Sequence, residues 1–219
     1  MSLTFKLTED RYSSDAAETG LTFTDVLFGV ALSELMTRLV LWDHVSNAAR
    51  LHMLLTAVTI LGSYIGFRKS QKRGQFGLRF FNIALLRFAV DQGMVFLYFW
   101  LALYLPTTEN AEPSASEIAK FDAKVVLAIF VLYFIWDLLC HWMAGTNKYY
   151  VKPLSGGDEQ RLSAPWYRTV ITTGGLALAL VGFAYDQSAR PSGYSADGLI
   201  GGLIVVTVAY RFFKDSISA

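Results

Sequence analysis

Cysteine and charge are both scarce in this chain, and each shortage excludes a class of protein. The 219 residues include one cysteine, Cys140. A single thiol forms no internal disulfide and anchors no zinc cluster, which excludes a disulfide scaffold and a zinc module. Charged residues make up 17% of the chain, whereas an ordinary soluble domain carries about 25%. The formal net charge of +1 leaves no domain-wide basic excess, so we expect no nucleic-acid partner.

Catalytic motifs are missing as well. The sequence has no G-x-S-x-G nucleophile elbow, no H-E-x-x-H zinc helix and no Gly-Lys-Ser/Thr phosphate loop. Cys140 and His141 are adjacent, so on a helix they point to different faces and do not form a nucleophile and its base. His44 and His52 are expected at the opposite side of the membrane from His141, which leaves no facing pair for haem. We therefore expect no enzyme, no catalytic residue, no cofactor and no metal site.

Apolar segments dominate what the sequence does contain, since 53% of its residues are hydrophobic. A bilayer core of about 30 Å requires roughly 20 apolar residues as a helix. Six segments approach this length, near residues 21–41, 51–67, 80–105, 123–143, 169–185 and 199–213. They predict an all-α integral membrane protein in which residues 21–215 form a six-transmembrane-helix bundle. Residues 1–20 are expected to be a cytoplasmic N-terminal segment.

The charges of the connections predict the orientation. Five basic residues and no acid lie between the second and third segments, namely Arg68, Lys69, Lys72, Arg73 and Arg79. The connection at 145–168 is also basic on balance. The connection between the third and fourth segments is acidic, with Glu109, Glu112, Glu117 and Asp122 against Lys120 and Lys124. The positive-inside rule then places both basic connections and both termini in the cytoplasm. We expect a multi-pass protein of the cell (inner) membrane, with the lipid bilayer as its partner.

Ionisable residues within the apolar segments need a reason, because each costs about 2.5–3.5 kcal/mol at the helix centre. They occur as pairs four residues apart, which are Glu34 with Arg38, Arg87 with Asp91, and Asp137 with His141. This spacing puts both members on one helix face. Two interpretations stay open: self-neutralised pairs that hold the bundle together, or a polar pathway for an ion or proton. Asp91 and the adjacent Gln92 are expected near mid-membrane and favour the second.

The first segment carries the most informative motif. It begins Phe23-Thr24-Asp25, and threonine and aspartate at a helix start also suit an N-terminal cap. The string resembles the opening helix of the transmembrane-protein-175 family of potassium channels, which has R-x-x-x-F-S-D at the start of a pore-lining helix. The resemblance covers about fourteen residues. It lacks the family arginine, since Thr19 stands there, and it has Glu34 where the family has an apolar residue.

This resemblance implies a homo-oligomeric, potassium-permeable channel, a tetramer with the first helix around a central pore. Its apolar constriction would map to Leu32, Met36 and Leu39. A constriction of this kind gates by dewetting and by the cost of stripping water from the ion. The Phe-Thr-Asp motif would hold the helix in register against its neighbours.

Two other functions stay open. A non-conducting sensor or scaffold subunit would act with a cytosolic partner docked on the basic connections at 68–79 and 145–168, although such connections also bind anionic lipid headgroups. A proton-coupled transporter would use Arg87, Asp91 and Glu34, but no internal repeat is evident in the sequence. Conduction by the reconstituted protein would separate the channel from the scaffold.

Overall fold

A computed structural model describes residues 23–72, 75–76, 83–105, 112–146, 150–151, 164–189 and 195–217. The first helix is described over residues 23–39. The elements that follow are the 3-10 helix η1 (Trp42–His44), α2 (Asn47–Lys72), β1 (Gln75–Phe76), α3 (Ile83–Leu103), α4 (Ala115–Thr146), β2 (Tyr150–Val151), α5 (Ala164–Ala189) and α6 (Ala196–Ile217). The predicted segment 1–20 and most of the two basic connections lie outside the described residues, as does the side chain of His141.

The described elements confirm the all-α prediction, apart from two strands of two residues each. Each predicted segment overlaps one helix, and α2 and α6 are longer than the short segments that predicted them. The polar residues at the helix ends account for the difference, because they continue the helix beyond the apolar stretch. The six described helices therefore agree with the six segments predicted from the sequence, whereas their boundaries differ from the predicted ones.

The start of α4 shows how a polar cap extends a helix. Ser114 donates from its backbone nitrogen and its Oγ to Glu117 Oε2, at 2.8 and 2.7 Å, and Glu117 N donates to Ser114 Oγ at 3.4 Å. This reciprocal arrangement is a capping box. The hydrogen bonds from Ser114 lower the pKa of the Glu117 carboxyl. The helix thus begins at Ala115 rather than near Ala123, and acidic residues expected in a connection lie in its first turns.

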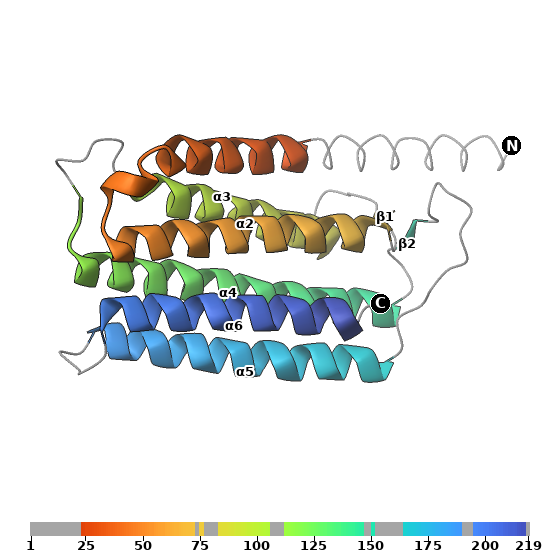
Figure 1. Cartoon of the computed structure of the whole chain (residues 1–219). Coiled ribbons are helices and arrows are strands. Elements are labelled where there is room, and N and C mark those ends of the chain that lie inside the picture. Colours follow the sequence, from red (N-terminus) through yellow and green to blue (C-terminus); the bar gives the residue numbers. More distant parts are fainter. Residues whose placement is uncertain are drawn as a thin grey trace, which may run out of the picture.

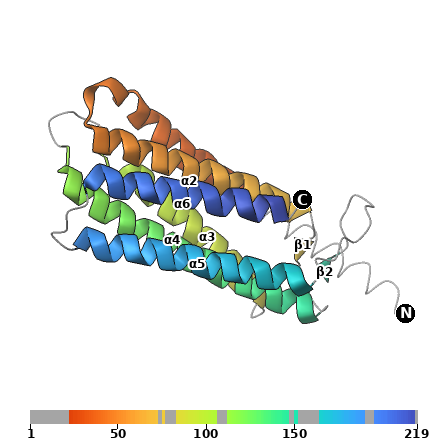
Figure 2. The ribbon, with the colours of Figure 1, turned by 60° about the horizontal axis from the view of Figure 1, so that its bottom comes forward.

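The six helices run up and down in one bundle (Figure 1). Because successive helices are antiparallel, α6 ends where the first helix begins. Helix α4 packs along α3 and α5, and α6 lies against α2, α4 and α5 (Figure 2). At that same end β1 and β2 pair in antiparallel fashion, with Gln75 opposite Val151 and Phe76 opposite Tyr150. This pairing brings the two predicted basic connections together.

An aromatic cluster attaches the first helix to the bundle. Phe28 is 6% exposed. Its ring centroid lies 5.3 Å from that of Tyr64 on α2 and 5.8 Å from those of Phe67 on α2 and Tyr98 on α3. Burial of such a ring removes a large apolar area from water and adds ring-to-ring contacts. The first helix therefore packs against both α2 and α3.

The outer surface of the bundle is apolar. Among the described residues, three helices are long and apolar enough to cross a membrane, over Asn47–Arg68, Leu85–Leu103 and Ala196–Lys214. Large apolar side chains are exposed on each of the six helices, for example Val30, Leu61, Phe96, Val131, Leu176 and Val205. Soluble monomers rarely expose extended apolar patches of this kind. The three apolar helices and this surface are compatible with a membrane protein.

Candidate functional site

Two buried polar networks lie toward opposite ends of the bundle. We call the first the ionic cluster, which consists of Arg87, Asp91, Trp136, Asp137, Tyr210, Arg211 and Lys214. We call the second the histidine junction, which consists of His52, Asp122 and the backbone carbonyl of Leu101. Polar groups inside an apolar bundle are costly unless they are partnered, so these two networks are the candidate functional sites of the bundle.

Asp137 of α4 is the centre of the ionic cluster. Its side chain accepts a hydrogen bond from Lys214 Nζ at 2.6 Å on Oδ1 and another from the Tyr210 hydroxyl at 3.0 Å on Oδ2. Lys214 Nζ also donates to the Tyr210 hydroxyl at 3.3 Å. A Cβ added to Gly174 of α5 would lie 3.8 Å from Asp137 Oδ2, so α5 approaches the carboxylate closely. The described partners of Asp137 are thus on α6, rather than the i+4 residue His141.

Trp136 connects this centre to α3. The guanidinium carbon of Arg87 lies 4.9 Å from the Trp136 ring centroid, and Lys214 Nζ lies 4.9 Å from the same centroid. Cations at this distance are attracted by the electron-rich face of an indole. Arg87 and Lys214 are also the charged neighbours of Asp91. The predicted pair Arg87 and Asp91 therefore belongs to a larger cluster that spans α3, α4 and α6.

Arg211 occupies a slot made by glycine. Its Nη2 donates to Ser63 Oγ at 2.6 Å, and its guanidinium carbon lies 4.2 Å from the Tyr133 ring centroid. A Cβ on Gly62 would lie 3.3 Å from Arg211 Cγ, and a Cβ on Gly66 would lie 3.0 Å from Arg211 Nη1. The two glycines of α2 therefore let the arginine side chain lie against the helix backbone.

A chain of hydroxyl groups continues from Arg211 across the bundle. Ser63 Oγ lies 2.5 Å from the Tyr133 hydroxyl, and the Tyr98 hydroxyl donates to the Tyr133 hydroxyl at 2.9 Å. All three side chains are buried. Together they link α2, α4 and α3 through contacts that do not depend on charge.

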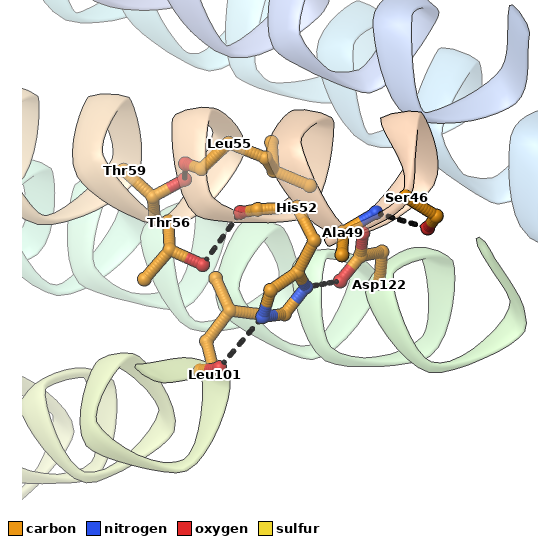
Figure 3. A network of polar contacts seen from close by, with 8 residues as sticks. All are labelled: Ser46, Ala49, His52, Leu55, Thr56, Thr59, Leu101 and Asp122. Carbon is orange, nitrogen blue, oxygen red and sulfur yellow. Dashed lines mark hydrogen bonds and ion pairs between the residues drawn. The ribbon is translucent and has the colours of Figure 1, made fainter. Parts of the chain in front are cut away.

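The histidine junction joins three helices at the other end (Figure 3). His52 of α2 places Nδ1 2.5 Å from Asp122 Oδ1 of α4 and Nε2 3.1 Å from the Leu101 carbonyl oxygen of α3. His52 is 1% exposed and Asp122 is 0% exposed. A histidine with a polar partner on each ring nitrogen is fixed in its orientation, and it holds the three helices at one point.

The charged groups of the first helix are turned toward the bundle. Arg38 forms an ion pair with Glu34, four residues earlier, and its Nη2 donates to the Leu103 carbonyl at 3.3 Å, at the end of α3. Asp25 Oδ2 lies 3.3 Å from Arg68 Nη1 of α2. Each charge on this helix within the described residues is therefore bound by a neighbouring side chain.

The motif at the start of the first helix contacts two other helices. Thr24 is buried, and its hydroxyl accepts a hydrogen bond from Gln92 Nε2 of α3 at 2.9 Å. Asp25 contacts α2, as described above, whereas Phe23 is exposed. Thr24 and Asp25 thus fix the first helix against α3 and α2, and Gln92 serves as the partner of Thr24.

The outward face of the first helix carries no charge over residues 23–39, where the helix is described. We call it the neutral stripe, and its residues are Val26, Gly29, Val30, Ser33, Met36 and Thr37, with Val40 directly after the helix end. Met36 is 56% exposed, whereas Leu32 and Leu39 are half-buried and pack against the core. No atom lies within 4 Å of a Cβ built on Gly29. Of the three constriction residues implied by the resemblance, Met36 is the one that faces outward.

Several members of these networks escaped the sequence analysis. Tyr210, Arg211 and Lys214 lie within five residues at the end of the last apolar segment, and Asp122 was assigned to a connection. The available signal was the density of ionisable and hydroxyl residues on one face of the last segment. Within the stretches that the structure covers, no group of three or more His, Cys, Asp or Glu side chains is placed to hold a metal ion.

Comparison of the chain with protein-family models, with curated proteins and with solved structures yields no match. The resemblance of the first helix to the transmembrane-protein-175 family therefore stays a prediction.

Proposed function

We propose that this chain is an integral membrane protein whose six helices each cross the bilayer. The support comes from the contrast between the two sides of each helix. Large apolar side chains face outward around the whole bundle, whereas the ionised side chains of the ionic cluster face inward and are partnered. In lipid an apolar exterior is favourable and ionised side chains are tolerated where they are paired inside the bundle, while in water the exterior would promote aggregation.

The proposed orientation follows from the basic connections. Strands β1 and β2 bring the connections after α2 and after α4 together at the end where the first helix begins and α6 ends. Basic connections favour the cytoplasmic side of a cell membrane. Both termini would then lie in the cytoplasm, and the histidine junction would lie toward the outer side.

The function that we infer is an oligomeric cation channel, of the potassium-permeable kind, in which first helices of several copies surround an axis. The observation that supports it best is the neutral stripe. Small and hydroxyl residues (Gly29, Ser33, Thr37) alternate there with apolar ones, and every charge of the helix is directed elsewhere. Such a wall suits a narrow pore in which an apolar side chain, here Met36, sets the constriction.

The charges inside one bundle favour an ion pathway between copies of the chain over a pathway through a single bundle. The ionic cluster contains three cationic side chains, Arg87, Arg211 and Lys214, against two carboxylates, Asp91 and Asp137. One positive charge is in excess, which repels a cation that approaches this part of the interior. Cations would therefore pass along the outward face of the first helix.

The test is cysteine accessibility in liposomes that contain a potassium gradient, with Cys140→Ala as background. A cationic thiol reagent should block flux through Ser33→Cys or Thr37→Cys, because it places a charge in the pore. The matched control is Val205→Cys on α6, which is 67% exposed and would face lipid. Silent liposomes would contradict the channel and favour a non-conducting subunit with a cytosolic partner. Equal block at Val205→Cys would contradict a pore lined by the first helix.

A second candidate, proton-coupled transport, is favoured by the position of Asp91 among Arg87, Trp136 and Lys214. An ionisable residue inside the membrane is a candidate for proton or substrate coupling. Transport would then depend on Asp91, so Asp91→Asn should abolish proton-driven uptake and leave the protein folded. An unchanged uptake in Asp91→Asn would exclude this role for the residue.

A further inference from the structure

We propose that the histidine junction is a proton-binding site, in which one proton held between His52 Nδ1 and Asp122 Oδ1 fastens α2 to α4. The site is separate from the neutral stripe and from the ionic cluster. It holds whether or not the chain conducts ions, because it follows from the geometry of three groups alone.

The Leu101 carbonyl determines whether His52 Nε2 carries a hydrogen. A carbonyl oxygen only accepts hydrogen bonds, so the 3.1 Å contact with His52 Nε2 places a hydrogen on Nε2. A neutral imidazole carries a hydrogen on only one of its nitrogens. If His52 were neutral beside an ionised Asp122, Nδ1 would present a lone pair to Asp122 Oδ1.

The distance between those two atoms requires a proton. His52 Nδ1 and Asp122 Oδ1 lie 2.5 Å apart, and two lone pairs at that distance repel each other. A proton in between converts the contact into a short hydrogen bond, whether the proton is nearer to the nitrogen or to the oxygen. In either case the pair holds one proton more than a neutral imidazole and a carboxylate.

Burial favours the same state. With the proton the pair carries no net charge, and without it one negative charge stays in a place that water does not reach, since Asp122 is 0% exposed. Asp122 Oδ2 has no hydrogen-bond partner within the described part of the chain. A buried carboxylate with so few donors is costly, so the surroundings retain the proton.

The neighbouring groups do not offer an alternative counter-charge. The ring of Tyr104, the residue after the end of α3, lies 5.8 Å from the His52 ring, and it stacks on Phe121 of α4 at 3.6 Å. Tyr104 is titratable but neutral below strongly alkaline pH, and its acidic neighbours are Glu117 and Asp122. From α2 itself, the Thr56 hydroxyl donates to the His52 carbonyl. None of these contacts brings a cation to Asp122.

Release of the proton would weaken the junction. The proton passes to water and leaves an imidazole with its hydrogen on Nε2 beside a carboxylate. The bond to Leu101 persists, but the bond between α2 and α4 is lost. The bond between α2 and α4 therefore exists only while the pair holds its proton.

The experiment is nitrogen NMR on histidine-labelled protein in nanodiscs, with His44→Gln and His141→Gln so that His52 is the one histidine observed. At about pH 7.5, where an ordinary histidine is neutral, both ring nitrogens of His52 should report a bound or shared hydrogen. In Asp122→Asn at the same pH, Nδ1 should report none.

An Nδ1 that neither binds nor shares a hydrogen in the protein that retains Asp122 would overturn the proposal, and so would an Nδ1 hydrogen that persists in Asp122→Asn. Should Asp122→Asn fail to fold, the first measurement decides by itself. Neither result depends on ion flux, so failure here is distinguishable from failure of the channel proposal.

Discussion

The histidine junction and the ionic cluster both bury polar groups, but they use different chemistry. The junction joins α2, α3 and α4 through one histidine, one carboxylate and one backbone carbonyl. The cluster joins α3, α4 and α6 through arginine, lysine and aspartate side chains, with tyrosine hydroxyls between them. Arginine and lysine stay charged across the pH range in which histidine titrates. The comparison teaches that one end of the bundle is held by permanent charge, whereas the other depends on a proton.

The two ends are linked by the register of α2 and α4. His52 and Asp122 are 70 residues apart in sequence, and so are Ser63 and Tyr133. The helices therefore run parallel with a constant offset, and the two polar contacts lie about 16 Å apart along α2. The first contact belongs to the histidine junction, and the second is joined to the ionic cluster through the hydrogen bond from Arg211 to Ser63. A change at one end can therefore be compared directly with a change at the other.

The largest effect is expected from removing the centre of the ionic cluster. Asp137→Ala leaves Lys214 as a buried cation without its carboxylate, which costs about 3–5 kcal/mol in the free energy of unfolding. Equilibrium unfolding of the detergent-solubilised protein measures it. The control is the double variant Asp137→Leu with Lys214→Met, which removes both charges and should recover most of the loss. A single variant as stable as wild type would contradict the assigned pairing.

A smaller effect is expected at the histidine junction. Asp122→Asn keeps the shape of the side chain and removes the carboxylate, so we expect a loss of about 1–3 kcal/mol in the same unfolding measurement at neutral pH. His44→Gln serves as the control, because His44 is exposed. A loss as large as that of Asp137→Ala would remove the difference between the two ends.

The glycine slot of Arg211 gives a third comparison. In Gly62→Ala the new Cβ would lie 3.3 Å from Arg211 Cγ, so the arginine must shift and its contact with Ser63 weakens. The matched control is Gly201→Ala on α6, where no atom lies within 4 Å of the added Cβ. Alanine favours a helix over glycine by about 1 kcal/mol. We expect Gly201→Ala to raise the free energy of unfolding. The free energy of unfolding of Gly62→Ala should be lower than that of Gly201→Ala by about 1 kcal/mol.

The smallest effect concerns the cap of α4, outside the apolar segments. Hydrogen bonds from Ser114 lower the pKa of Glu117 below its ordinary value of 4.5. Because the folded-state pKa is the lower one, this stabilisation is present above about pH 4.5 and is lost as pH falls through the folded-state value. Glu117→Gln should therefore reduce the acid dependence of unfolding, measured between about pH 6 and pH 3. Ser114→Ala should do the same, and a steeper acid dependence in either variant would contradict the cap.

The sequence predicts the helices well because each apolar stretch is long enough to identify. It predicts contacts within a helix too, since the four-residue spacing is enough to find Glu34 beside Arg38. Contacts between helices are different. Lys214 and Asp137 are 77 residues apart, and no periodicity within one helix indicates which other helix lies beside it. For the same reason the sequence did not predict the partner of His52. Asp122 was assigned to a connection, whereas α4 begins before it, at the capping box formed by Ser114.

The most direct test of the account is the sidedness of the bundle in intact cells. With Cys140→Ala as background, Ser116→Cys reports the end that holds the histidine junction, and Gln75→Cys in β1 reports the end where the basic connections meet. A thiol reagent that does not cross membranes should label Ser116→Cys from outside and Gln75→Cys only after the membrane is opened. Labelling of both positions from outside, or of neither until the membrane is opened, would contradict a bundle that crosses the bilayer with its basic end in the cytoplasm.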